Sequence, residues 1–84
     1  MMLEAGIVEL DIHHMTRYQA EVAINAKLRR AGRGTYRIRV IHGYNSGTAL
    51  RDFVRKQYRT HPTVLRVEIG MNPGVTDLVL REYI

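Results

Sequence analysis

The chain has 84 residues, of which 45% are hydrophobic and 25% are charged, and it contains no cysteine. This length suits one domain with one core, and the balance of apolar and charged residues argues against a disordered chain. Without cysteine there is no disulfide framework and no thiolate metal site. No apolar run approaches the roughly 20 residues of a membrane span. We therefore expect a single cytoplasmic domain over residues 1–84.

The charge of the chain favours a polyanionic partner. Thirteen basic residues outweigh eight acidic ones and give a net charge of +5. Eleven of the basic residues are arginine, whose planar guanidinium fits phosphate and stacks on bases. Nucleic acid, either DNA or RNA, is the leading class of partner. The alternative is a basic surface that only keeps the protein in solution.

A strand followed by a helix is predicted in the first third of the chain. Residues 7–13 alternate apolar and polar side chains, which is typical of a strand with one buried face. Thr16 and Gln19 have the spacing of a capping box that begins a helix. Apolar residues at helical spacing continue it, and Gly32 is expected to end it. The expected buried stripe contains Ala20, Ala23, Ile24, Leu28 and Ala31.

The same order repeats in the middle of the chain and ends in a hairpin. A strand is predicted over residues 36–42 and an amphipathic helix from Leu50 to the His61–Pro62 step. Strands at 64–69 and 75–83 flank a turn centred on Pro73 and Gly74. Helical crossovers make the first three strands parallel, and the turn adds an antiparallel strand. The predicted fold is α/β, an α+β sandwich of order βαβαββ with a mixed four-stranded sheet and two helices.

Two histidine-bearing segments should meet at one edge of this sheet. Asp11 and His13 end the first strand, and His42 ends the second. Ligands bind beyond the carboxyl ends of parallel strands in such sheets. Asp11 can orient His13 as a general base, while His42 can protonate a leaving oxygen or stabilise phosphoryl charge. The structural alternative is that Asp11 pairs with a backbone N–H or an arginine, and that the histidines only end the strands.

The loop after the second strand is the candidate binding element. It contains Gly43, Tyr44, Asn45, Ser46, Gly47 and Thr48. Hydroxyl groups and the free amides of the following helix suit a phosphate. Tyr44 can stack on an unpaired base, or it is simply an exposed turn residue. Arg51 and Arg55 follow in a stripe of like charges, completed by Arg59, that a polyanion would neutralise.

Five segments in this order resemble the Smr domain, the small MutS-related module. They are LDIH at 10–13, a helix that opens with threonine, VIHG at 40–43, SGTALR at 46–51 and GVT at 74–76. The resemblance implies a βαβαββ sandwich similar to the C-terminal domain of bacterial translation initiation factor three. It also implies binding of nucleic acid, often with nicking of DNA or cleavage of RNA. Asp11 and His13 are thereby implicated in cleavage, and the loop from His42 in binding and in shaping the active site.

The sequence departs from the family pattern at His14 and Asn45, where glycines are usual. We therefore predict a stand-alone, monomeric Smr-like domain that binds nucleic acid, with endonuclease activity as the catalytic hypothesis. The alternatives are a binding module without cleavage and a domain that docks on an acidic or ribosomal surface. Histidine spacing does not suggest zinc. The sequence identifies no definite cofactor, and cleavage with or without a metal both stay open. A metal that acts is expected to be Mg²⁺ held partly by substrate phosphate.

Overall fold

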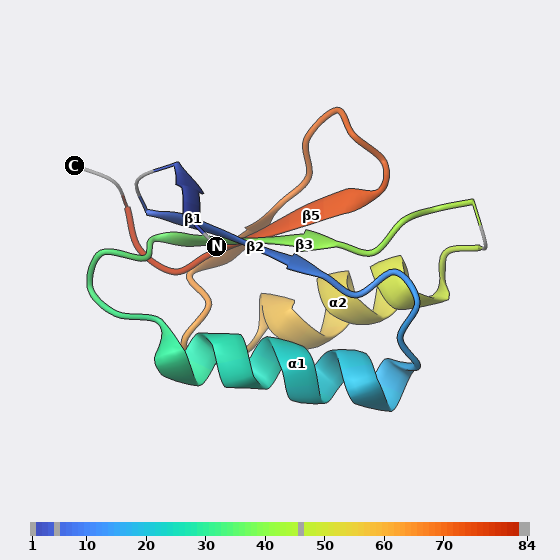
Figure 1. The fold of residues 1–84 in the computed structure, drawn as a ribbon, viewed down its shortest axis with the longest axis horizontal. Helices are drawn as coiled ribbons and strands as arrows, with labels where there is room; N and C mark the ends of the chain where they lie inside the picture. The colour runs from blue at the N-terminus through green and yellow to red at the C-terminus, as the bar shows by residue number, and fades with distance from the viewer. Residues whose placement is uncertain (1, 5, 46, 83–84) are drawn as a thin grey trace.

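The computed structural model describes residues 2–4, 6–45 and 47–82. The elements in chain order (Figure 1) are β1 (Met2–Glu4), β2 (Ile7–Asp11), α1 (Arg17–Arg30), β3 (Arg37–Ile41), α2 (Ala49–Arg59), β4 (Arg66–Glu68) and β5 (Val75–Val79). The predicted βαβαββ order and mixed sheet are confirmed, and β1 adds a short strand before them. None of the helices in these ranges is long and apolar enough to cross a membrane.

The sheet has the strand order β1-β2-β3-β5-β4. β2 and β3 pair in parallel, whereas β5 is antiparallel to both of its neighbours, β3 and β4. The first three predicted strands therefore run in one direction, as expected. The last strand lies between β3 and β4, so Val40 of β3 is paired with Leu10 on one side and with Thr76 on the other.

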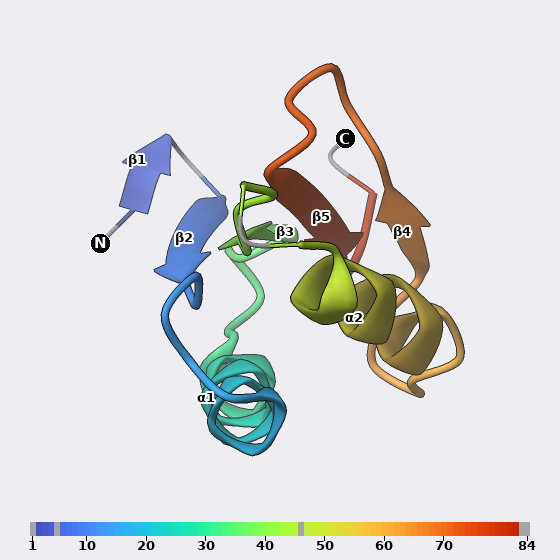
Figure 2. The ribbon, with the colours of Figure 1, turned by 90° about the vertical axis from the view of Figure 1, so that its right-hand side faces the viewer.

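Both helices cover one face of the sheet and leave the other face without a helix (Figures 1 and 2). The predicted stripes of both helices point into the layer between helices and sheet, where Ile24 and Val54 are fully buried. The core cluster consists of Ile12, Ala20, Ile24, Leu28, Ile38, Val40, Phe53, Val54, Tyr58, Val64 and Leu78. Burial of these side chains provides the main driving force for the two-layer arrangement.

Several predicted element boundaries are shifted. β2 ends at Asp11, earlier than predicted, because the carbonyl of Ile12 accepts a hydrogen bond from Met15 N at 2.9 Å and turns the chain. β5 ends at Val79, and the predicted end at residue 83 lies outside the described residues. α1 ends before Gly32, but through an extended Ala31 and not through a left-handed glycine. The predicted turn at Pro73 and Gly74 is present, closed by a bond from Val75 N to the Asn72 carbonyl at 3.2 Å.

Candidate functional site

The carboxyl ends of β2 and β3 meet beside a cavity of about 740 Å³. Pairing continues past the end of β2, since Ile12 N donates to the carbonyl of Ile41 at 2.9 Å. His13 and His42 both line the cavity, together with the loop after β3 and the first residues of α2. The predicted meeting of the two histidine-bearing segments is therefore confirmed.

Asp11 and His13 form a hydrogen-bonded pair at this cavity. Oδ1 of Asp11 accepts bonds from the backbone N and from Nδ1 of His13, at 3.0 and 2.5 Å. The imidazole bond and the backbone bond lower the pKa of Asp11, so the carboxylate is ionised and acts only as an acceptor. The Nδ1 atom of His13 must then carry the proton, and Nε2 of the neutral ring keeps its lone pair. This is the arrangement of a general base oriented by a carboxylate.

Aromatic rings surround the same cavity. The ring of His14 lies 3.6 Å from that of His13, centroid to centroid, with the two planes tilted by 47°. Tyr44 is 52% exposed. Its ring lies close to Gly74, since a Cβ atom placed on that glycine would be 3.4 Å from Cδ1 of Tyr44. Exposed rings beside a cavity offer flat surfaces on which an unpaired base can stack.

His42 differs from His13 because it is buried, with only 4% of its surface exposed. Its Nδ1 atom lies 2.8 Å from the carbonyl of Gly43, and its Nε2 atom lies 2.8 Å from Oγ1 of Thr76. Nε of Arg55 donates to the same Oγ1 atom at 2.9 Å. Burial lowers the pKa of His42, and the charges of Arg55 and Arg51 lower it further. Both ring nitrogens of this histidine are thus engaged inside the protein.

The loop after β3 is shaped by two glycines and anchored by a third. Gly43 has φ +75° and Gly47 has φ +112°, both in the region that favours glycine. The carbonyl of Gly74 accepts bonds from the backbone N atoms of both His42 and Gly43, at 2.9 and 3.0 Å. Asn45 has a negative φ, as does every described residue other than glycine. The turn before β5 therefore holds the first residues of the loop in place.

At the N-terminus of α2, three backbone amides have no hydrogen-bond partner among the described residues. Its N-cap residue, Thr48, makes no capping hydrogen bond, and its hydroxyl donates instead to Asp52 Oδ2 at 3.1 Å. The first helical bond runs from Asp52 N to the Thr48 carbonyl at 2.8 Å. No described residue accepts from the amides of Ala49, Leu50 and Arg51. Ala49 and Leu50 also line the cavity, so an anion there can reach free amides at a helix N-terminus.

The other predicted binding residues are placed differently. Arg51 and Arg55 lie on the flank of α2 and do not line the cavity. Arg51 pairs with Asp52 at 3.1 Å, and burial together with the charges of Arg51 and Arg59 lowers the pKa of Arg55. The predicted stripe of like charges is therefore present. Ser46 lies outside the described residues.

The residues that sequence reasoning missed come mainly from the segment before and within β5. Asn72 and Gly74 line the cavity, and Thr76 binds His42. A signal was available, because GVT at 74–76 was one of the segments that carried the family resemblance. Its role was not readable from the chain alone because it depends on the pairing of β3 with β5.

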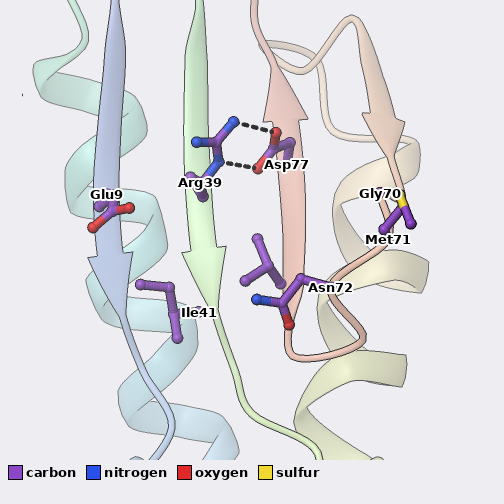
Figure 3. Close-up of a pocket in the computed structure, with 8 residues that line it drawn as sticks. Glu9, Arg39, Ile41, Gly70, Met71, Asn72 and Asp77 are labelled. Carbon is purple, nitrogen blue, oxygen red and sulfur yellow. Dashed lines mark hydrogen bonds and ion pairs between the residues drawn. The ribbon is translucent and has the colours of Figure 1, made fainter. Parts of the chain in front are cut away.

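The helix-free face of the sheet has another cavity, of about 470 Å³, in which Arg39 and Asp77 are paired with each other (Figure 3). Asp77 accepts a bond from Nη1 of Arg37 at 2.6 Å and from Nε of Arg39 at 3.1 Å. Arg37 also pairs with Glu68 at 2.9 Å. These arginines already have carboxylate partners, so this face attracts a polyanion less than the edge that carries His13 and the α2 N-terminus.

At the cavity beside β2 and β3, the described side chains do not form a metal site by themselves. Across residues 2–4, 6–45 and 47–82, no group of three or more His, Cys, Asp or Glu side chains is placed to hold a metal ion. Asp11 offers one carboxylate, whose Oδ1 atom is bonded to His13. A Mg²⁺ ion fits here only if substrate oxygens supply most of its ligands.

Known proteins resemble this chain, and the family match includes both histidine-bearing segments of the cavity beside β2 and β3. The model of the Smr domain family matches residues 10–74, from the start of the LDIH segment to Gly74. The Smr domain of Thermus thermophilus MutS2 has a similar structure, with a TM-score of 0.77 and 27% sequence identity over 89% of this chain and 99% of that one. No curated protein matches the sequence significantly. The family match covers well over half of the chain, and the protein belongs to the Smr domain family.

Proposed function

We propose that this Smr domain binds nucleic acid at the cavity beside β2 and β3 and cleaves a phosphodiester bond there. One observation carries the proposal: His13, oriented by Asp11, lines the same cavity as the first residues of α2, whose amides have no partner among the residues that the structure describes. The amides attract a phosphate and the imidazole can activate an attacking oxygen. The net charge of +5 supports a polyanionic substrate.

In this proposal His13 is the general base. Its Nε2 atom takes the proton of the attacking oxygen, which belongs to water or to a ribose 2′-hydroxyl. The oxygen attacks phosphorus, and the bond from phosphorus to the leaving sugar oxygen breaks. The leaving oxygen keeps the electron pair of that bond and takes up a proton, either from the imidazolium or from water, in which case the imidazolium returns its proton to solvent. Asp11 stabilises the imidazolium, and the amides of Ala49 and Leu50 stabilise the charge on the phosphoryl oxygens.

The remaining candidate residues bind and position the substrate. Tyr44 stacks on an unpaired base, and the loop of Gly43, Asn45, Gly47 and Thr48 surrounds the phosphate. Arg51 and Arg55 neutralise neighbouring phosphates. We propose a supporting role for His42, in place of the proton transfer that the sequence suggested, because both of its ring nitrogens are engaged. Mg²⁺, if it takes part, uses Asp11 and the substrate phosphate.

The test is an assay of binding and cleavage with three proteins: wild type, His13→Gln and the control His61→Gln. His61 lies just after α2, where its Nδ1 atom accepts a bond from Thr63 N at 3.2 Å. Labelled single-stranded RNA and supercoiled plasmid are incubated with each protein, with Mg²⁺ and with chelator. We expect H13Q to keep its binding and to lose cleavage by about 100-fold or more, the usual contribution of a general base. H61Q should behave as wild type.

Two results would contradict the proposal. Binding without cleavage by the wild type would assign the chain to the non-catalytic binding modules. Absence of binding by the wild type would remove nucleic acid as the partner and favour docking on an acidic protein surface, which competition with an acidic protein would then examine.

A further inference from the structure

We infer that Arg55 and Thr76 are positioning residues that hold His42 in a single tautomer and, through it, fix the first residues of the loop 43–48. From the sequence alone, Thr76 has no predicted role and Arg55 is expected only to contact phosphate. The effect on nucleic acid rests on the proposed function. The tautomer itself follows from hydrogen-bond geometry and can be measured without nucleic acid.

The direction of every hydrogen bond in this chain of contacts is determined. The carbonyl of Gly43 can only accept, so Nδ1 of His42 is the donor in their 2.8 Å contact. In the neutral ring Nε2 is then an acceptor, and the hydroxyl of Thr76 is its donor at 2.8 Å. The lone pairs of Thr76 Oγ1 in turn accept Nε–H of Arg55 at 2.9 Å. The order is Arg55 to Thr76 to His42 to Gly43, with each donor matched to one acceptor.

The alternative protonation state does not fit the same contacts. In a charged imidazolium, Nε2 would also donate to Thr76 Oγ1, so that two cations, His42 and Arg55, would donate to one oxygen. The hydroxyl proton of Thr76 would then need another acceptor. Thr76 is fully buried and His42 is 4% exposed, so water cannot readily supply one. The contacts therefore specify the neutral Nδ1–H tautomer.

The tautomer matters because it fixes both polar backbone groups of Gly43. Its N–H donates to the carbonyl of Gly74 at 3.0 Å, and its C=O accepts from Nδ1 of His42. Gly43 is also the residue at which the loop leaves the sheet, with φ +75°. The other tautomer would leave the Gly43 carbonyl without its donor and would free the loop to turn. Arg55 and Thr76 thus act on the loop without lining the cavity.

The first measurement is the ¹⁵N spectrum of the histidine rings at neutral pH. We expect His42 to show a protonated-type shift at Nδ1 and an unprotonated-type shift at Nε2. Thr76→Val keeps the shape of the side chain but removes the hydroxyl. It should broaden or shift the His42 signals and weaken binding of labelled single-stranded RNA at least fivefold. Thr76→Ser, which retains the hydroxyl, should restore both.

A matched pair on α2 separates this positioning role from simple loss of charge. Arg55→Met and Arg59→Met remove the same charge from the same flank of the helix, but only Arg55 contacts Thr76. R55M should change the His42 signals, whereas R59M should leave them as they are in the wild type. The spectrum is the deciding readout, because Arg55 also neutralises phosphate in the proposed function and its loss weakens RNA binding for that reason as well. This comparison remains decisive if T76V does not fold.

The inference is overturned if His42 is an imidazolium or the Nε2–H tautomer in the wild type, or if R55M leaves the His42 signals unchanged, as R59M should. If the wild type shows the expected tautomer but binds no RNA, the proposed function fails and the assignment of the tautomer stands.

Discussion

The two helices of this domain begin in opposite ways. At the N-terminus of α1, the hydroxyl of Thr16 accepts a bond from Gln19 N at 3.1 Å, and Gln19 Oε1 accepts one from Thr16 N at 2.9 Å. At the N-terminus of α2, Thr48 occupies the same position but bonds to Asp52 and makes no cap. The N-terminus of α1 is capped by its own side chains. At the N-terminus of α2, beside the cavity, no residue in the described part of the chain pairs with the first amides of the helix.

This difference shows that a threonine placed before a helix does not always cap that helix. Threonine is a good N-cap, so two threonines before two helices predict two similar helix ends. Only the cap of α1 is formed, and it stabilises a helix end that binds nothing in our proposal. The open end of α2 lacks that stabilisation, and it is the end beside His13 and Gly43. A helix N-terminus that binds an anion is expected to lack the stability of a side-chain cap, because its backbone amides have to stay available to the anion.

Among the changes that test this comparison, capping the N-terminus of α2 should have the largest effect. Thr48→Asp places a carboxylate that takes the free amides of α2 and repels phosphate. We expect binding of labelled single-stranded RNA to weaken at least tenfold, about 1.4 kcal/mol, while the thermal unfolding temperature stays the same or rises. Fluorescence anisotropy at low salt measures the affinity. The control is Thr63→Asp, which makes the same charge change in an exposed loop, and equal weakening by both would attribute the effect to net charge.

Opening the closed end should lower stability without changing binding. Thr16→Ala removes the cap of α1, and we expect the free energy of unfolding to fall by about 1 kcal/mol. Thr48→Ala is the matched change at a residue that makes no cap, and its cost should stay below about 0.5 kcal/mol. Urea unfolding of the two variants gives both values. A similar loss in both would mean that Thr48 caps α2 in solution.

The smallest effect is the pH dependence that Asp11 contributes. Its folded-state pKa lies below 3.8 because of its bonds to His13, so the unfolded chain binds a proton at pH values where the folded chain does not. The stability from this pair is complete above pH 3.8 and is lost as the pH falls through the lowered pKa. The carboxylate is 52% exposed, so the effect is modest. Thermal unfolding should show the advantage of wild type over Asp11→Asn shrinking in acid, and an advantage that is constant with pH would exclude this linkage.

Local patterns were sufficient to predict most of the fold. Two-residue alternation gave β2 and β3, and the spacing of Ile24, Leu28, Phe53 and Val54 gave the buried stripes of the helices. The parallel direction of β2 and β3 followed from the helix between them. β1 was missed because three residues are too few to show a period. The position of β5 between β3 and β4 was also missed, since pairing between strands distant in sequence leaves no local pattern.

The site was predictable in its location but not in its internal bonding. The ends of β2 and β3 had to lie at one edge, so His13 and His42 could be placed together. Their different surroundings could not be read from the chain. His42 is bonded to Thr76, which comes from β5, and Thr76 is bonded in turn to Arg55, which lies in the second turn of α2. The roles of residues in the site beyond these contacts stay predictions.

The central position of β5 has a consequence for synthesis of the chain. When β3 and β4 have left the ribosome, neither can complete its pairing, because the strand that joins them comes last among the described elements. Each keeps an open edge of the kind that promotes association between chains. The carbonyl of Gly74, which anchors the loop after β3, arrives at the same late moment. We therefore expect β3 and β4 to expose unpaired edges, and the loop after β3 to lack its Gly74 anchor, until β5 is inserted between them.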